Sequence, residues 1–166
     1  MVKRITDLYI AKKTPIFCNA GSQVTASGWS RISDGTWHLA PNKSANTMII
    51  DVPVQKGDII TSFRVLGGVM GSVTGGSTTI DADLRRVTYS SGTAVTDASL
   101  GAITQLVMNG TTEIDSSKTL TTEHEVAEDY QYYILITGTT NNNGDSHAKI
   151  YGAEVDIKRR YGKEAT

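Results

Sequence analysis

The chain has almost no residues that could form a stabilising covalent cross-link within the fold. It holds one cysteine, Cys18, in 166 residues, which excludes an intramolecular disulfide and a metal site built on a cysteine pair. We interpret Cys18 as a buried free thiol and not as a nucleophile, because no activating partner lies near it in the sequence. A single domain of this length buries roughly 70% of its unfolded surface, so a hydrophobic core is sufficient.

Long apolar runs are also missing. No stretch approaches the roughly 18 continuous apolar residues of a membrane helix, and the charged residues 1–7 have no apolar segment behind them, so they do not resemble a signal peptide. We therefore expect a protein that is made in a cytoplasm, stays there or in particles assembled there, and has no membrane partner.

Excess charge of one sign is absent overall but present locally. The whole chain carries −1, whereas residues 1–13 carry +3 and residues 158–166 carry +3, which leaves −7 for residues 14–157. Such basic ends can be interaction tails, or they can simply be well-solvated termini. As tails, they would bind a partner through Lys3, Arg4, Lys12, Lys13, Arg159 and Arg160.

Alternation of apolar and polar side chains, which is typical of half-buried strands, runs through most of the chain. Residues 47–54 and 59–66 both alternate and are separated by a compact turn, so we expect them to form a hairpin. The inward residues predicted for these two strands are Met48, Ile50, Val52, Val54, Ile59, Phe63 and Val65. A second hairpin is expected where residues 28–32 and 36–39 flank Ser33-Asp34-Gly35.

Several other segments are assigned from composition. Residues 67–76 are glycine-rich and are interpreted as a connection at a strand end, and residues 121–129 as a polar connection with room for one helical turn. Residues 97–110 fit either a short helix or a strand, and we favour the strand because Gly101 and Thr104 weaken a helix.

The C-terminal third gives the clearest strand signals. Residues 130–138 are aromatic and β-branched on both faces, which predicts a central strand covered on both sides. In the closing strand, residues 148–158, one face is expected to carry Tyr151, Ala153, Val155 and Ile157. About eight short strands predict an all-β fold of two antiparallel sheets. We divide the chain into a basic arm (1–14), a β-sandwich domain (15–158) and a basic tail (159–166).

Catalytic, cofactor-binding and metal-binding motifs are not recognisable. The glycine-rich segment lacks the Lys-Ser/Thr of a phosphate loop, and the three histidines are scattered. Asp81 and Asp83 share the outer face of the predicted strand 79–89 with Arg85, where solvation is their expected role; a hydrolase built on this pair ranks last among our hypotheses. We therefore expect no enzyme, no cofactor and no metal. Nucleic-acid binding is not expected either, because the body is acidic.

Two segments together carry a family resemblance. Residues 52–63, and residues 130–140 followed by a polar turn and residues 150–155, make the chain similar to jelly-roll virion structural proteins of tailed bacteriophages, such as capsid decoration (cement) proteins, head fibres and tail adhesins. The resemblance implies a sandwich of jelly-roll type. It also implies a homotrimer in the virion that binds the major capsid protein or other virion subunits. The sequence lacks the shaft repeats of long fibres, which favours a compact decoration protein. The subunit interface would then involve Tyr130, Tyr132, Tyr133 and Leu135.

An alternative is a carbohydrate- or receptor-binding adhesin module of a head fibre or tail. Jelly rolls can bind glycans in aromatic-lined grooves, and the aromatic candidates in this sequence are Trp29, Trp37 and Tyr89. The competing interpretation of these side chains is core packing.

Overall fold

The fold is built from strands. A computed structural model describes residues 9–19, 22–23, 28–70, 78–88, 95–108, 113–140 and 147–160, and no helix occurs among them. The strands are β1 (Tyr9–Asn19), β2 (Ser22–Gln23), β3 (Trp29–Arg31), β4 (Trp37–Leu39), β5 (Lys43–Asp51), β6 (Ile59–Met70), β7 (Thr78–Thr88), β8 (Thr96–Met108), β9 (Glu113–Glu125), β10 (Tyr130–Thr140) and β11 (His147–Arg160). It follows that these described residues offer no helix capable of crossing a membrane.

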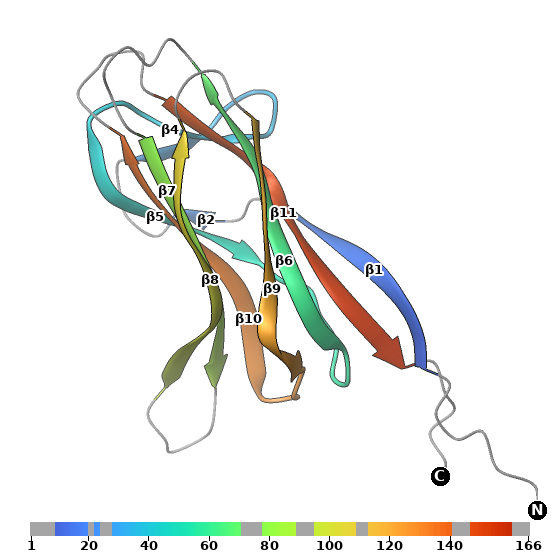
Figure 1. The fold of residues 1–166 in the computed structure, drawn as a ribbon. Coiled ribbons are helices and arrows are strands. Elements are labelled where there is room, and N and C mark those ends of the chain that lie inside the picture. The colour runs from blue at the N-terminus through green and yellow to red at the C-terminus, as the bar shows by residue number, and fades with distance from the viewer. Residues whose placement is uncertain are drawn as a thin grey trace, which may run out of the picture.

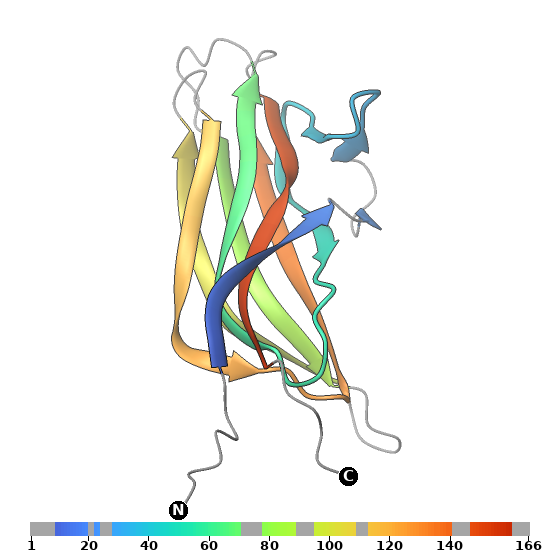
Figure 2. The same cartoon turned by 90° about the vertical axis from the view of Figure 1, so that its right-hand side faces the viewer.

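The strands form two antiparallel sheets that face each other (Figures 1 and 2). Sheet A has the order β1-β11-β6-β9, with β4 and then β3 added beside the first residues of β11. Sheet B has the order β2-β5-β10-β7-β8. The first residue of β1, Tyr9, pairs with the last residue of β11, Arg160, at one end of the sandwich.

The connectivity is that of a jelly roll. Of the eight long strands, β1, β6, β9 and β11 lie in sheet A and β5, β7, β8 and β10 in sheet B, so the chain crosses repeatedly between the sheets. The predicted antiparallel sandwich is therefore confirmed. The additional strands, β2, β3 and β4, are two or three residues long.

The predicted hairpin between residues 47–54 and 59–66 is wrong. These residues form β5 and β6, which lie in different sheets. The connection is tied to the β9–β10 turn by two backbone hydrogen bonds, Gly57 N to Val126 O and Val126 N to Asp58 O. Alternation records that each strand has one buried face, but it does not distinguish a hairpin from a crossing between two facing sheets.

The core lies between the sheets and is aliphatic. Met48 and Ile50 of β5, and Ile134 and Ile136 of β10, have no exposed surface. Burying each such side chain stabilises the fold by roughly 1.5–3 kcal/mol. Other fully buried members are Ile80, Ala82, Leu84, Val65, Val155 and Ile157. Cys18 is also buried, as predicted, and its burial raises the pKa of the thiol to about 11, with a smaller contribution from Asp51.

Two β-bulges change which residues face inward. Against β11, Thr61 is an extra residue of β6, and on this side of the bulge Ile60 is buried and the predicted Ile59 is only half-buried. The register of β11 shifts between Ile150 and Gly152, so Ile150 is buried and the predicted Tyr151 is 47% exposed. An extra residue in one strand reverses the facing of its neighbours, and simple alternation does not reveal it.

The less clear segments are strands as well. Residues 96–108 form β8, which confirms the preferred interpretation, whereas residues 121–125 belong to β9 and correct the predicted connection. Gly67 and Gly68 lie within β6, and residues 71–77 are outside the described part.

The β3–β4 hairpin is confirmed. Ile32 N donates to Thr36 O across its turn, and Gly35 has a φ of 84°.

The sheets extend beyond the predicted domain limits. β1 begins at Tyr9, before the predicted boundary at residue 15, and β11 continues to Arg160, beyond residue 158. Residues 1–8 and 161–166 are outside the described part of the chain.

Candidate functional site

The outer face of sheet B gathers polar side chains from three adjacent strands. β10 is central, between β5 and β7, and its alternate residues point away from the core. Tyr133 of β10 lies opposite Asp51 of β5 on one side and opposite Arg85 of β7 on the other. Arg85 in turn lies opposite Ser99 of β8. One row across the sheet therefore places an aromatic ring, a guanidinium and a hydroxyl side by side.

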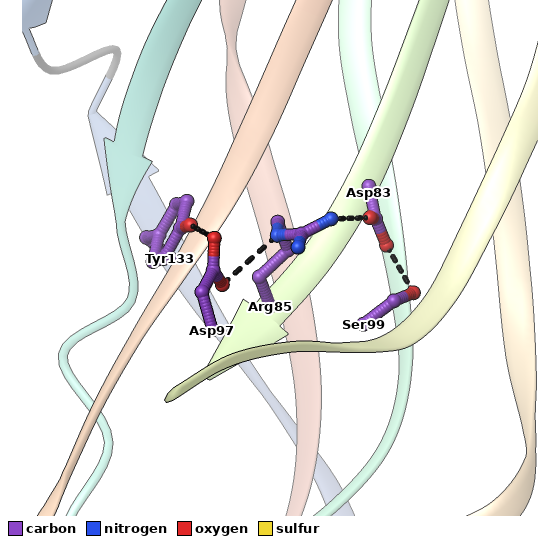
Figure 3. Close-up of polar contacts among 5 residues, drawn as sticks. All are labelled: Asp83, Arg85, Asp97, Ser99 and Tyr133. Atoms are coloured by element: carbon purple, nitrogen blue, oxygen red, sulfur yellow. Dashed lines mark hydrogen bonds and ion pairs between the residues drawn. The ribbon is translucent and has the colours of Figure 1, made fainter. Parts of the chain in front are cut away.

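These side chains form a continuous hydrogen-bond network (Figure 3). Arg85 donates through Nη1 to Asp83 Oδ2 at 2.6 Å and through Nε to Asp97 Oδ1 at 3.0 Å. Ser99 Oγ donates to Asp83 Oδ1 at 2.5 Å, and Tyr133 OH donates to Asp97 Oδ2 at 2.8 Å. We call these five residues the Arg85 network. Each carboxylate uses both oxygens, so the guanidinium and the tyrosine are held in fixed positions.

The network fixes charge as well as position. Partial burial opposes the charged form of Asp97, but hydrogen bonds from Arg85 and Tyr133 hold its pKa below the usual value. Burial raises the pKa of Tyr133, and its hydrogen bond to Asp97 raises it further. At neutral pH the face therefore presents a neutral tyrosine hydroxyl and ionised Asp97 and Arg85.

Arg85 retains hydrogen-bonding capacity toward solvent. A guanidinium has five N–H donors. One contacts Asp83 and another contacts Asp97, and the guanidinium also interacts with the Tyr133 hydroxyl. The Arg85 side chain is 23% exposed. Beside it, Leu135 lies opposite both Ile49 and Asp83, and Leu135 and Ile49 are half-buried. The face thus combines oriented donors with apolar surface.

The outer face of sheet A also has an ion-paired arginine, but it is more exposed to solvent and has no tyrosine opposite it. Arg64 of β6 contacts Glu154 of β11 at 2.5 Å and Asp115 of β9 at 3.5 Å. Its side chain is 39% exposed, against 23% for Arg85, and the residue directly opposite it on β9 is Ser117, not a tyrosine. Arg64 therefore serves as an internal reference for Arg85.

The aromatic residues predicted to bind glycans are separated by the structure. Trp29 is 2% exposed and its Nε1 donates to the Asn46 carbonyl at 3.0 Å, so the indole belongs to the core and its assignment as a glycan ligand is wrong. Trp37 is half-buried and packs against the core. Tyr89 is outside the described residues.

The residues predicted at a subunit interface, three tyrosines and Leu135, do not share one surface. Tyr132 points into the core, is 3% exposed, and its hydroxyl contacts His124 Nε2 at 2.9 Å, so it is not available to a second subunit. Tyr130 packs near Tyr132, with the Arg86 guanidinium 4.9 Å from its ring centroid. Tyr133 and Leu135 lie on the outer face, where no third layer of described residues covers them.

Among the basic residues predicted to bind a partner, Arg159 has an internal partner. Its Nε and Nη2 donate to the two carboxylate oxygens of Asp58, each at 2.7 Å. Lys12, Lys13 and Arg160 lie in β1 and β11, but their side chains are outside the described part, as are Lys3 and Arg4 entirely. For these five residues partner binding stays a prediction.

Part of the Arg85 network follows from the sequence. Alternation predicts that Asp81, Asp83 and Arg85 share one outward face, as the structure has them, although their expected role is solvation. The proximity of Asp97, Ser99 and Tyr133 does not follow from alternation, because it depends on the pairing of β8 and β10 with β7. No group of three or more histidine, cysteine, aspartate or glutamate side chains that could hold a metal occurs within the described ranges.

Comparison with known proteins gives likeness of shape only. No protein-family model matches the chain, and no curated protein matches it. Similar solved structures include a CBM36-1 domain of a xylanase from the hindgut metagenome of Trinervitermes trinervoides (13% identity, TM-score 0.47, 93% of this chain and 100% of that one). Others are the C-terminal CBM6 of LamC, a laminarinase of Zobellia galactanivorans (15%, 0.45, 86% and 99%), and the xylan-binding module CBM86 from Roseburia intestinalis (12%, 0.45, 89% and 96%).

Proposed function

We propose that the chain is a carbohydrate-binding module that contacts its glycan with the outer face of sheet B. The observation that supports this proposal is the Arg85 network, in which a partly exposed guanidinium and a tyrosine are held in position on a sheet face beside half-buried aliphatic side chains.

A sugar ring suits such a face chemically. Its hydroxyl oxygens accept hydrogen bonds from the unused N–H groups of Arg85, and its C–H surface packs against the Tyr133 ring and Leu135. Binding sites commonly combine apolar contact area with a few placed polar groups that fix orientation. Tyrosine adds contact area at a low cost in conformational entropy because it has two side-chain torsions.

The test is affinity gel electrophoresis of the protein against a panel of soluble neutral and acidic polysaccharides, followed by titration calorimetry with any that binds. Arg85→Gln is expected to weaken binding about tenfold or more, the loss of a charged hydrogen bond. Tyr133→Ala, which removes the ring, should weaken it similarly, whereas Tyr133→Phe tests the hydroxyl alone.

Arg64→Gln is the matched control, because it removes an ion-paired guanidinium from the opposite face of the sandwich. It is expected to leave the affinity unchanged. If no polysaccharide retards the protein, or if Arg64→Gln weakens binding while Arg85→Gln does not, the proposal is wrong.

Virion decoration is a second candidate, which a different observation favours. The two basic ends of the chain, residues 1–13 and 158–166, carry +3 each. Tyr9 pairs with Arg160 and Ile10 with Arg159, so the described parts of these two ends lie side by side at one end of the sandwich. Two adjacent basic segments suit an acidic capsid surface. We expect the protein to sediment with tailed-phage capsids at low salt and to be released at high salt, whereas absence from the pellet at low salt would contradict this function.

A further inference from the structure

The β3–β4 hairpin closes one end of the sandwich with few backbone contacts. We call residues 28–39 the flap. β4 pairs with β11 over three residues only, Trp37 with Ile150, His38 with Lys149 and Leu39 with Ala148. Because short pairings open more readily than long ones, the flap is expected to be among the less stable parts of the sheet.

Side chains of the flap reach into the core. An added Cβ at Gly138 of β10 would lie 2.5 Å from Leu39 Cδ2 and 2.9 Å from Trp29 Cζ2, which shows how closely both side chains pack over that strand. Trp29 is therefore buried only while the flap is closed, and its indole reports on the position of the flap.

A histidine pair joins the flap to the rest of sheet A. His38 of β4 and His147 of β11 stack with ring centroids 4.7 Å apart and planes inclined by 24°. His38 Nε2 and His147 Nδ1 are buried, and neither has a hydrogen-bond partner among the residues that the structure describes. A neutral imidazole tolerates such surroundings far better than a charged one, because an imidazolium needs partners for both N–H groups.

The charges around the pair do not favour protonation. Lys149 of β11 and Asp34 of the β3–β4 turn are the charged neighbours of His38, and they form an ion pair with each other at 2.8 Å. Opposite His38, β3 contributes Ser30, and opposite Lys149, β6 contributes Gly68. Burial lowers the pKa of His38, as do the positive fields of His147 and Lys149, and Asp34 opposes them only in part.

The pair is not a complete metal site in the described structure. Structural zinc sites use four protein ligands and catalytic ones three, and over the described ranges no third histidine, cysteine, aspartate or glutamate joins His38 and His147. Proton uptake is then the chemistry that the two unpartnered nitrogens can perform.

We propose that His38 and His147 form an acid-sensitive latch that releases the flap when the imidazoles are protonated. The first proton adds a charge to a half-buried ring, one nitrogen of which is buried and has no hydrogen-bond partner among the described residues. The second places two like charges 4.7 Å apart beside Lys149. Opening the flap allows water to solvate both rings, so acid shifts the equilibrium toward the open flap and the exposed Trp29.

The sign of the pH dependence follows from linkage. A histidine whose pKa is lower in the closed state than in the open state binds protons preferentially when the flap is open. The closed flap is therefore at full stability above the ordinary histidine pKa of 6.5 and loses stability as the pH falls below it.

The experiment is hydrogen exchange followed by NMR between pH 7.5 and 5.0, with rates corrected for intrinsic exchange. In the unmodified protein, protection of the Leu39 and Ala148 amides and of the Trp29 indole N–H is expected to fall about tenfold or more, while the β7–β10 amides stay protected. His147→Gln, which removes one of the two imidazoles and its positive field on His38, should weaken this acid response. His124→Gln, which alters a histidine that contacts Tyr132 OH, should preserve it.

Three results would overturn the latch. The first is an acid response in His147→Gln that is as large as in the unmodified protein. The second is a loss of amide protection that spreads equally over β7 and β10. The third is an increase in protection of the flap by micromolar Zn²⁺, which would identify the pair as a metal site. A readout without mutation covers the case that His147→Gln does not fold. The ring-proton titration of His38 must then share the midpoint of flap opening, and a midpoint that differs from it contradicts the proposal.

Discussion

Backbone conformation at single residues is most unusual around the start of β5. Asn42 and Ala45 have φ values of 55° and 52°, a region that side chains other than glycine rarely adopt. Threonine hydroxyls of β10 hold this bend, since Thr140 Oγ1 accepts from Lys43 N at 3.0 Å and Thr139 Oγ1 accepts from Ala45 N at 3.1 Å. The left-handed conformation costs an L-residue roughly 1–2 kcal/mol, so these contacts offset a local strain.

Ala45→Gly is expected to stabilise the protein. Glycine adopts the positive φ without steric cost, and the gain exceeds its larger loss of backbone entropy, so we expect the free energy of unfolding to rise by about 0.5 kcal/mol. Urea unfolding measures this change. Ala98→Gly in β8, where φ is not positive, is the matched control and should destabilise by about 0.5–1 kcal/mol. Equal destabilisation by both substitutions would show that Ala45 is not strained.

At the scale of elements, a buried ion pair fastens the β5–β6 connection to the end of β11. Asp58 is 1% exposed. It accepts from Arg159 through both oxygens and from Gln55 N at 2.9 Å. Its neighbours Lys56 and Glu128 form an exposed ion pair at 2.6 Å, which is expected to contribute little. The crossing between the sheets therefore depends on Asp58 far more than on the surface charges around it.

Asp58 should make stability fall in acid. Burial acts to raise its pKa, but the hydrogen bonds from Arg159 and Gln55 prevail and hold it below the ordinary 3.8. The carboxylate stabilises the fold above 3.8, and this contribution is lost as the pH falls through the lowered folded-state value. Asp58→Ala is expected to cost about 3 kcal/mol at pH 7, measured by urea unfolding.

The control for this prediction is Glu128→Ala, which breaks the exposed pair with Lys56 and should cost about 0–1 kcal/mol. The cost of Asp58→Ala should shrink between pH 4 and pH 2, because the wild-type carboxylate is then protonated too. A cost that stays constant over this range would mean that the ion pair with Arg159 does not stabilise the fold.

Element type could largely be read from the sequence, whereas of the strand pairings only the local β3–β4 hairpin could be predicted. The outward positions of Asp81, Asp83 and Arg85 and the inward positions of Ile80, Ala82 and Leu84 follow from alternation alone. Alternation does not predict that β5 and β6 lie in different sheets. It also does not predict the bulges that bury Ile60 and expose Tyr151. These depend on which strands pair across the whole chain, and a local pattern carries no information on that.

At the scale of the whole molecule, the jelly roll leaves two outer faces and a flap that pairs with β11 over three residues. The faces differ in a way the sequence does not reveal: in sheet B the Arg85 network joins three strands and includes a tyrosine, whereas in sheet A the Arg64 cluster is more exposed. The two outer faces of the sandwich therefore differ. The outer face of sheet B is better suited than that of sheet A to hold a ligand in a fixed orientation.

NMR chemical-shift mapping, with a fragment of whichever polysaccharide retards the protein, tests most directly where a ligand binds. We predict that the perturbed amides lie in β7, β8 and β10 around Arg85, Asp97 and Tyr133, with no change around Arg64 and Glu154. Perturbations confined to sheet A, or to the flap, would contradict the assignment of the outer face of sheet B as the binding surface.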